Sequence, residues 1–320
     1  MSVYIHGGLR IPIGVLNGQY RNMRPEMLGA QLINELINRY DISQVDGIFC
    51  GNAVGTGGNI GRLMGLMSNL SVSTPAVTID MQCASALMSI EMAYTHIASG
   101  VMDSAIAGGI ESSSLQPDRM YAAGDNREGL YKVAQFSPND CSPLAMLEGA
   151  ERTIQKHNVL KEDLYPYIIG SHKRASEALN NPHLKSYIMP ITIDGKACVD
   201  ECIRPKMNEK LLSRMKPLLG KNSITNAGNA CLTHDGAAFV YVSNEKGPFR
   251  IHSIMPWAGN PQFSPEGALE STEAILKRTG LTMDDIDVVE WNEAFAIIDV
   301  LFNKAYPKHL EKYNKLGGAL

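Results

Sequence analysis

Residues 75–112 read PAVTIDMQCASALMSIEMAYTHIASGVMDSAIAGGIES, and this stretch decides the fold. Residues 75–80 are rich in β-branched side chains, which predicts a buried strand. Residues 84–99 are nearly uncharged and are followed by Gly100, a residue that commonly ends helices, so we expect a helix in the middle of the fold. Residues 105–109 predict a short strand that runs into a turn at Gly108-Gly109.

Cys83 lies between the predicted strand and the first turn of the predicted helix. A thiol there faces unpaired backbone N–H groups and the positive end of the helix dipole, and both favour the thiolate form. The same N–H groups can stabilise an oxyanion on an attacked thioester carbonyl. Cys83 is therefore a candidate nucleophile, and a small cysteine that fills the core is the alternative.

Strand and helix signals alternate along most of the chain, which predicts an α/β fold with mainly parallel sheets. Residues 116–222 differ, because strand signals become rare and amphipathic helices are predicted near 150–158 and 171–179. Beyond them we expect strands at 237–242 and 249–254 and a helix at 265–279.

A short segment occurs twice. Residues 43–52 and 282–292 share a polar turn, a Val/Ile-Asp pair, a short apolar strand and a polar tip. This self-similarity predicts two related halves. Because only 29 residues follow Trp291, the second half is expected to be incomplete.

Composition limits the possible classes of protein. The 320 residues carry a formal net charge of −4, which indicates neither a nucleic-acid partner nor a membrane surface. No apolar run reaches the roughly 20 residues of a transmembrane helix, and the N-terminus has no basic region typical of a signal peptide. Six scattered cysteines argue against a disulfide framework, so a cytoplasmic location is expected. Cys198 and Cys202 have no nearby histidine, so we expect no metal site there.

Several ordered motifs, from about residue 3 to the end of the chain, resemble those of the thiolase family. The motifs are Arg10-Ile11-Pro12-Ile13-Gly14, Asn59-Ile60-Gly61-Arg62, Cys83-Ala84-Ser85, Gly108-Gly109-Ile110-Glu111-Ser112, Asn226-Ala227-Gly228-Asn229-Ala230-Cys231, Asp235-Gly236-Ala237-Ala238 and Asn292-Glu293-Ala294-Phe295-Ala296.

This resemblance implies an α/β thiolase fold with two related βαβαβ halves, central buried helices and an inserted helical subdomain. The first half would span 1–115 plus 223–245, the CoA-binding insertion 116–222, and the incomplete second half 246–320. The family also implies a homodimer or homotetramer that associates through the first half, with an acyl-CoA or coenzyme A as substrate and no further cofactor.

The resemblance also assigns roles to individual residues. Cys83 would accept the acyl group of an acyl-CoA as a thioester, and Asn292 would orient a water molecule in an oxyanion hole. Arg204 would pack on the CoA adenine. The residues of the pantetheine and acyl pocket would be Met146, Ala227, Cys231 and Phe295. Without the resemblance, Asn292 would be a strand-end residue that caps a turn, Arg204 a solvated charge, and Met146 and Phe295 core.

The chain also departs from the family pattern. Cys231 and Leu211 replace serines that contact CoA, and Ser264-Pro265-Glu266-Gly267 replaces a glycine-rich turn. The family's Gly-His-Pro motif and its later Cys-x-Gly-Gly motif, which supplies a second catalytic cysteine, are not in the sequence. Two hypotheses follow: an acetyl-CoA acetyltransferase or 3-ketoacyl-CoA thiolase, or a non-catalytic thiolase-like protein that binds CoA or a partner without turnover. The related ketoacyl synthases are less favoured because of the Asn292–Ala296 motif.

Overall fold

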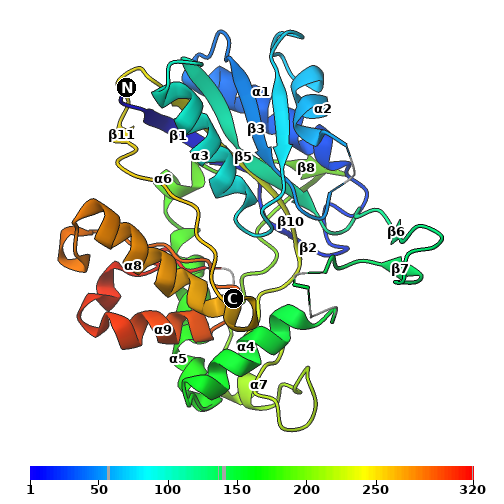
Figure 1. Cartoon of the computed structure of the whole chain (residues 1–320), viewed down its shortest axis with the longest axis vertical. Helices are drawn as coiled ribbons and strands as arrows, with labels where there is room; N and C mark the ends of the chain where they lie inside the picture. The colour runs from blue at the N-terminus through cyan, green and yellow to red at the C-terminus, as the bar shows by residue number, and fades with distance from the viewer. Residues whose placement is uncertain (56–57, 136, 139–141, 319) are drawn as a thin grey trace. The chain divides into compact units, whose positions relative to one another are not determined.

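The computed structural model describes residues 1–55, 58–135, 137–138, 142–318 and 320. One of the six cysteines, at position 141, lies outside this range. The chain divides into two compact units (Figure 1). Unit 1 contains residues 1–117, 182–201 and 233–255, and unit 2 contains 118–181, 202–232 and 256–320. The three-part division expected from the sequence stays a prediction.

Unit 1 is built on a seven-stranded mixed sheet in the order β11-β1-β10-β5-β3-β4, with β2 also paired to β10. Strand β3 runs parallel to β4 and β5, whereas β1 and β10 pair antiparallel, so the sheet is less parallel than expected. The strands are β1 (Tyr4–Arg10), β2 (Gly14–Val15), β3 (Gly47–Gly51), β4 (Ala76–Ile79), β5 (Ser104–Ser112), β10 (His234–Ser243) and β11 (Phe249–Arg250).

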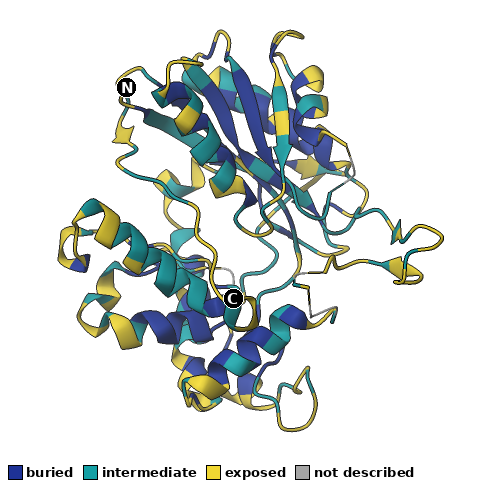
Figure 2. Ribbon diagram, in the orientation of Figure 1, coloured by how far each residue is buried: buried dark blue, intermediate teal, exposed yellow. Residues whose placement is uncertain are grey.

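Helices cover both faces of this sheet, because neighbouring residues of a strand point to opposite sides. Ile48 and Ile106 share one core with α1 (Pro25–Tyr40) and α2 (Ile60–Met67). Their neighbours Phe49 and Ala105 pack in a second core with α3 (Ser85–Ala98). Strand β3 is accordingly buried along its whole length, as the dark blue of Figure 2 shows. Unit 1 is completed by α6 (Pro182–Lys185), β8 (Thr192–Ile193) and β9 (Lys196–Ala197).

Unit 2 is mainly helical. Its largest core joins α4, α5 and α9, and a smaller core contains Met283, Val289, Phe302 and Tyr313. The helices are α4 (Ala145–Lys156), α5 (Tyr165–Ala178), α7 (Glu209–Ser213), α8 (Gly267–Thr279) and α9 (Ile297–Ala305). Short 3-10 helices are η1 (Glu162–Leu164), η2 (Pro261–Glu266), η3 (Met283–Asp285) and η4 (Pro307–Lys312), and a hairpin joins β6 (Arg119–Met120) to β7 (Leu130–Tyr131).

Two local predictions are wrong. Gly108 and Gly109 lie inside the nine-residue β5 rather than in a turn, because both pair with β10 and β3. The strand expected within 282–292 is reduced to a single bridge between Val289 and Tyr313. A ladder of more than one bridge does not form there, because the described part of unit 2 places no strand beside this segment. None of the helices in the described residues combines the length and hydropathy needed to cross a lipid bilayer.

Candidate active site

Cys83 occupies the connection between β4 and α3, as the sequence predicts, and its side chain is exposed. Three local interactions fix this connection. Gln82 adopts a positive φ of 52°, and its backbone N–H donates to Asp80 Oδ1 at 2.9 Å. The Ser85 hydroxyl accepts a hydrogen bond from Met81 N at 2.8 Å and donates one to Gln82 O at 2.6 Å. The turn that presents Cys83 is therefore stabilised from both sides of the cysteine.

Two glycines let α3 approach the sheet closely. A Cβ atom on Gly51 would lie 2.5 Å from Ala86 N, and one on Gly109 would lie 3.2 Å from Ala86 Cβ. Larger residues at these positions would force the first turn of α3 away from β3 and β5. The glycines thus determine where the N-terminus of α3, and with it Cys83, sits over the sheet.

The first turn of α3 supplies the donors expected beside a nucleophile. The first helical hydrogen bond runs from Met88 N to Ala84 O at 2.9 Å. Helix geometry therefore leaves the N–H groups of Ala86 and Leu87 without intrahelical acceptors. Such N–H groups can stabilise the negative charge of a tetrahedral intermediate.

In unit 2 the segments 226–231 and 292–296 lie side by side. Cys231 N donates to Ala294 O at 2.9 Å, and Ala296 N donates to Asn229 O at 2.9 Å. An isolated antiparallel bridge between Ala230 and Phe295 lies between these two bonds. Two motifs more than sixty residues apart in the sequence thus form one local structure.

The candidate residues of these segments differ in exposure. Phe295 is buried, and Met146 packs against the same core. Cys231 is half-buried, whereas Ala227 and Asn292 are exposed. An apolar wall and accessible positions beside it therefore occur together in unit 2.

A buried carboxylate holds the segment before residue 226. Glu151 of α4 accepts hydrogen bonds from Ile224 N at 3.0 Å, from Thr225 N at 2.8 Å and from the Thr225 hydroxyl at 2.7 Å. The role of Glu151 was not predicted from the sequence. The only available signal was an acidic residue on the apolar side of an amphipathic helix.

A second buried carboxylate belongs to Glu293, the residue that follows Asn292 in the sequence. Glu293 is fully buried, accepts a hydrogen bond from Asn314 Nδ2 at 3.0 Å and from the Ser171 hydroxyl, and lies 3.8 Å from Arg174 Nη2. Asn314 also pairs with the backbone of Trp291 through bonds of 2.8 and 3.0 Å. The backbone on both sides of Asn292 is therefore fixed, while the Asn292 side chain stays accessible.

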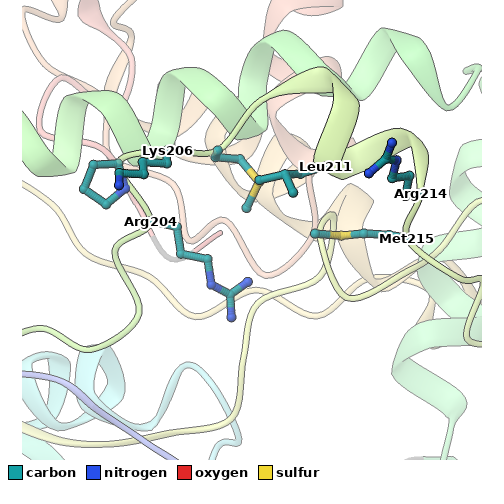
Figure 3. Close-up of a pocket in the computed structure, with 7 residues that line it drawn as sticks. Arg204, Lys206, Leu211, Arg214 and Met215 are labelled. Atoms are coloured by element: carbon teal, nitrogen blue, oxygen red, sulfur yellow. The ribbon is translucent and has the colours of Figure 1, made fainter.

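Arg204 lines an open pocket of about 530 Å³ in unit 2 (Figure 3). The pocket combines three cationic side chains with apolar ones, and its lining residues are Arg204, Pro205, Lys206, Met207, Leu211, Arg214 and Met215. The Arg204 backbone is held by a hydrogen bond to His172 Nδ1 at 3.3 Å. Burial, and then the charge of Arg204, lower the pKa of His172 below its usual range, so the imidazole is neutral near pH 7 and can accept this bond.

The predicted residues thus divide between the units. Cys83 belongs to unit 1, and Asn292, Arg204, Met146, Ala227, Cys231 and Phe295 belong to unit 2. Lys206 and Arg214 were not predicted. Their signal in the sequence was the presence of further basic residues within ten positions of Arg204. Within the described residues, no group of three or more His, Cys, Asp or Glu side chains is placed to hold a metal ion.

Comparisons with known proteins identify the family of this chain. The family model for the thiolase N-terminal domain matches residues 3–246, and that for the thiolase C-terminal domain matches residues 249–320. A Staphylococcus epidermidis protein named "Putative acetyl-CoA C-acetyltransferase VraB" is 31% identical over 97% of this chain and 85% of its own length. A Staphylococcus aureus protein of the same name is 31% identical over 97% of this chain and 86% of its own.

A solved structure shares the fold. The crystal structure of the Bacillus anthracis acetyl-CoA acetyltransferase superposes with a TM-score of 0.91 at 24% identity, covering 99% of this chain and 86% of that one. This likeness confirms the predicted α/β thiolase fold. Together, the two family models cover nearly the whole chain, and the chain therefore belongs to the thiolase family.

Proposed function

We propose that this protein transfers acyl groups to and from coenzyme A, with Cys83 as the residue that carries the acyl group. The Cys83 thiolate would attack the thioester carbonyl, and the carbon–sulfur bond to CoA would break as the new thioester forms. CoA would leave as a thiolate that takes up a proton. The observation that carries this proposal is the exposed Cys83 at the N-terminus of α3, beside N–H groups that have no intrahelical acceptor.

The pocket around Arg204 supports coenzyme A as the carrier. CoA combines phosphate groups with a flat adenine ring and a pantetheine arm that has both apolar and polar groups. Arg204, Lys206 and Arg214 offer three positive charges, and Met207, Leu211 and Met215 offer apolar contacts. Arginine suits such a ligand, because a guanidinium can both bind phosphate oxygens and stack on an aromatic ring.

Asn292 has a supporting role in this proposal. Its family counterpart orients a water molecule toward the thioester oxygen, and the exposed side chain on a fixed backbone suits that task. Phe295 and Met146 would form part of the apolar wall that the acyl chain or pantetheine arm contacts.

Intact-protein mass spectrometry after incubation with acetyl-CoA tests the nucleophile. We expect one acetyl adduct per chain and one equivalent of released CoA in the wild type and in Cys198→Ala, a control variant of a half-buried cysteine. Cys83→Ala should form no adduct. An adduct that persists in Cys83→Ala, or none in the wild type, would refute Cys83 as the acyl carrier.

Calorimetric titration with CoA tests the pocket separately. Lys206→Ala and Arg204→Ala should each weaken CoA binding by about tenfold, the effect of losing roughly 1.4 kcal/mol of binding free energy, with a weaker effect at high salt. Lys210→Ala, an exposed lysine of α7 outside the pocket lining, should bind as the wild type does. CoA binding without any adduct on Cys83 would favour the alternative function, a CoA-binding protein without turnover.

A further inference from the structure

Asp299 is a carboxyl group in the core of unit 2. It lies in the first turn of α9, is 1% exposed, and belongs to a run in which residues 297–302 are all buried. Neither of its oxygens has a hydrogen bond of standard geometry among the described residues, and its polar neighbours are the Glu293 carboxyl and the Tyr313 hydroxyl. An ionised carboxylate without hydrogen bonds in an apolar core is strongly disfavoured, whereas the neutral acid is far less so.

Glu293 brings a second carboxyl group to the same place. Glu293 is 0% exposed and keeps its hydrogen bonds to Ser171 and Asn314. Burial is the largest cause that raises the pKa of Asp299, and the neighbouring Glu293 is the next. The Tyr313 hydroxyl lowers this pKa by a smaller amount. Arg174 is the cation that acts on this pair, and it lies 3.8 Å from Glu293. One guanidinium can balance only one of the two carboxylates.

The other titratable groups around this pair do not supply the missing positive charge. Tyr167 of α5 faces Asp299 as a neutral phenol bound to Asn303, and burial raises its pKa above the usual range. His172 of α5 acts on Glu293 but is neutral near pH 7. Glu290 adds a third carboxyl group near Glu293 and no positive charge, and burial and Glu293 raise its pKa. The charge balance therefore favours a neutral Asp299, in agreement with a pKa raised well above the carboxyl range by burial and by Glu293.

We propose that Asp299 holds a proton in the folded protein, and that this neutral acid allows Glu293 to remain an anion and to position Asn292. Loss of the proton would place two anions in one buried site and repel Glu293 from Ser171 and Asn314. The backbone of Trp291, which Asn314 holds, would then be released together with Asn292. Asp299 is thus a positioning residue that makes the loop sensitive to alkaline pH. Only the consequence for acyl transfer rests on the proposed function.

The sign of the pH dependence follows from the raised pKa of Asp299. The unfolded chain releases this proton near the ordinary carboxyl pKa of about 4, while the folded chain keeps it to higher pH. The stabilising effect of the protonated acid is complete below that value and is lost as pH rises toward the folded-state pKa. Over this range the folding equilibrium constant of the wild type should fall by up to about tenfold per pH unit relative to a variant without the titration.

Urea unfolding of the wild type and of Asp299→Asn between pH 5 and 9 tests the proton. Both tryptophans, Trp257 and Trp291, lie in unit 2, so their fluorescence reports on this unit. Asp299→Asn should remove the alkaline loss of stability, whereas Asp287→Asn, an exposed aspartate of the same unit, should keep the wild-type slope. An Asp299→Asn variant that keeps the wild-type pH slope would show that Asp299 is ionised and would overturn the proposal.

Carbon-13 NMR of wild-type protein labelled at aspartate carboxyls measures the same proton without a substitution, so the test stands even where Asp299→Asn does not fold. A carboxyl resonance that titrates in the acidic range at every aspartate would refute the proposal. For the functional consequence, the rate of Cys83 acetylation relative to Cys83 alkylation by iodoacetamide should fall at alkaline pH in the wild type and not in Asp299→Asn. If acetylation is absent at every pH, the proposed function fails, while the stability and NMR results still decide where the proton is.

Discussion

Replacing Glu151 with glutamine removes the charge that organises the segment before residue 226. The carboxylate accepts hydrogen bonds from two backbone N–H groups and one hydroxyl, at 2.7 to 3.0 Å, and Glu151 is 8% exposed. Hydrogen bonds to charged groups contribute roughly 1.5–3 kcal/mol each, and a buried donor left unpaired costs about 1–3 kcal/mol. Glutamine keeps one acceptor oxygen and turns an NH2 group toward the other donors. We therefore expect Glu151→Gln to lower the free energy of unfolding by about 2–4 kcal/mol.

Urea unfolding followed by tryptophan fluorescence measures this loss, because both tryptophans lie in unit 2. Glu148→Gln is the matched control. Its side chain lies one turn earlier on α4, is 34% exposed and is 3.9 Å from Arg152, so its loss should be at most about 1 kcal/mol. CoA binding should also weaken in Glu151→Gln, since Ala227 and Cys231 follow the anchored segment. Equal stability of the two variants would show that Glu151 does not anchor this segment.

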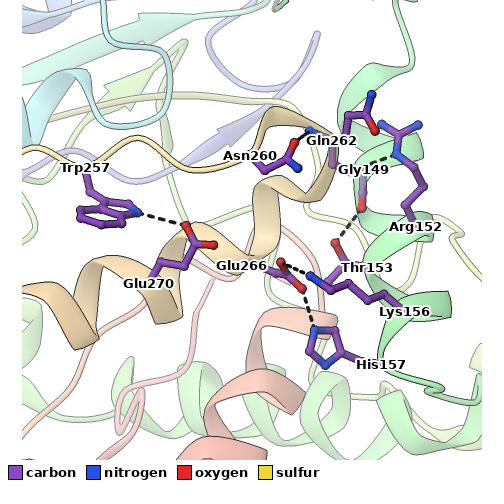
Figure 4. Close-up of polar contacts among 10 residues, drawn as sticks. All are labelled: Gly149, Arg152, Thr153, Lys156, His157, Trp257, Asn260, Gln262, Glu266 and Glu270. Carbon is purple, nitrogen blue, oxygen red and sulfur yellow. Dashed lines mark hydrogen bonds and ion pairs between the residues drawn. The ribbon is translucent and has the colours of Figure 1, made fainter.

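Three further predictions follow from the local geometry. Gly51→Ala places a Cβ atom 2.5 Å from Ala86 N and should lower the free energy of unfolding of unit 1 by about 1–3 kcal/mol, measured by far-ultraviolet circular dichroism. Gly267→Ala, whose Cβ atom would have no neighbour within 4 Å, should cause no such loss, and equal stability of the two variants would contradict the close approach of α3. Burial raises the pKa of Cys50 to about 12, so an aromatic disulfide at pH 8 should label the exposed Cys83 at least about tenfold faster than Cys50. Peptide mapping measures the two rates, and similar rates would contradict a buried Cys50 and an exposed Cys83. Burial tends to raise the pKa of Glu266, but hydrogen bonds from Lys156 and His157 lower it below its usual value (Figure 4). Lys156→Met should therefore lower the free energy of unfolding by about 1 kcal/mol at pH 7, and by progressively less as pH falls through the carboxyl range. Lys173→Met, from an exposed pair, is its control, and a loss that does not depend on pH would show that this ion pair is not the cause.

The position of Cys83 could be predicted because its causes are local. A β-branched strand, a short connection and an apolar run closed by Gly100 are adjacent in the sequence, and the structure places β4, Cys83 and α3 in that order. The motifs of residues 226–231 and 292–296 could also be recognised. Their role in CoA chemistry remains a prediction.

Other parts of the fold depend on neighbours that are distant in the sequence. The apolar run at 286–291 has the composition of a strand, yet Val289 forms only one bridge, because a strand requires a partner to which it can hydrogen bond. Gly108 and Gly109 have the composition of a turn, yet they extend β5 between two neighbouring strands.

The sequence by itself determined the thiolase family, the strand–cysteine–helix connection and the candidate residues, since each is carried by short motifs. Only the tertiary structure decided that residues 226–231 pair with residues 292–296, that Lys206 and Arg214 share a pocket with Arg204, and that Glu151, Glu293 and Asp299 are buried. The physical reason is that burial and long-range pairing set the energy of a charge or a hydrogen bond, and neither can be read from the residues next to it.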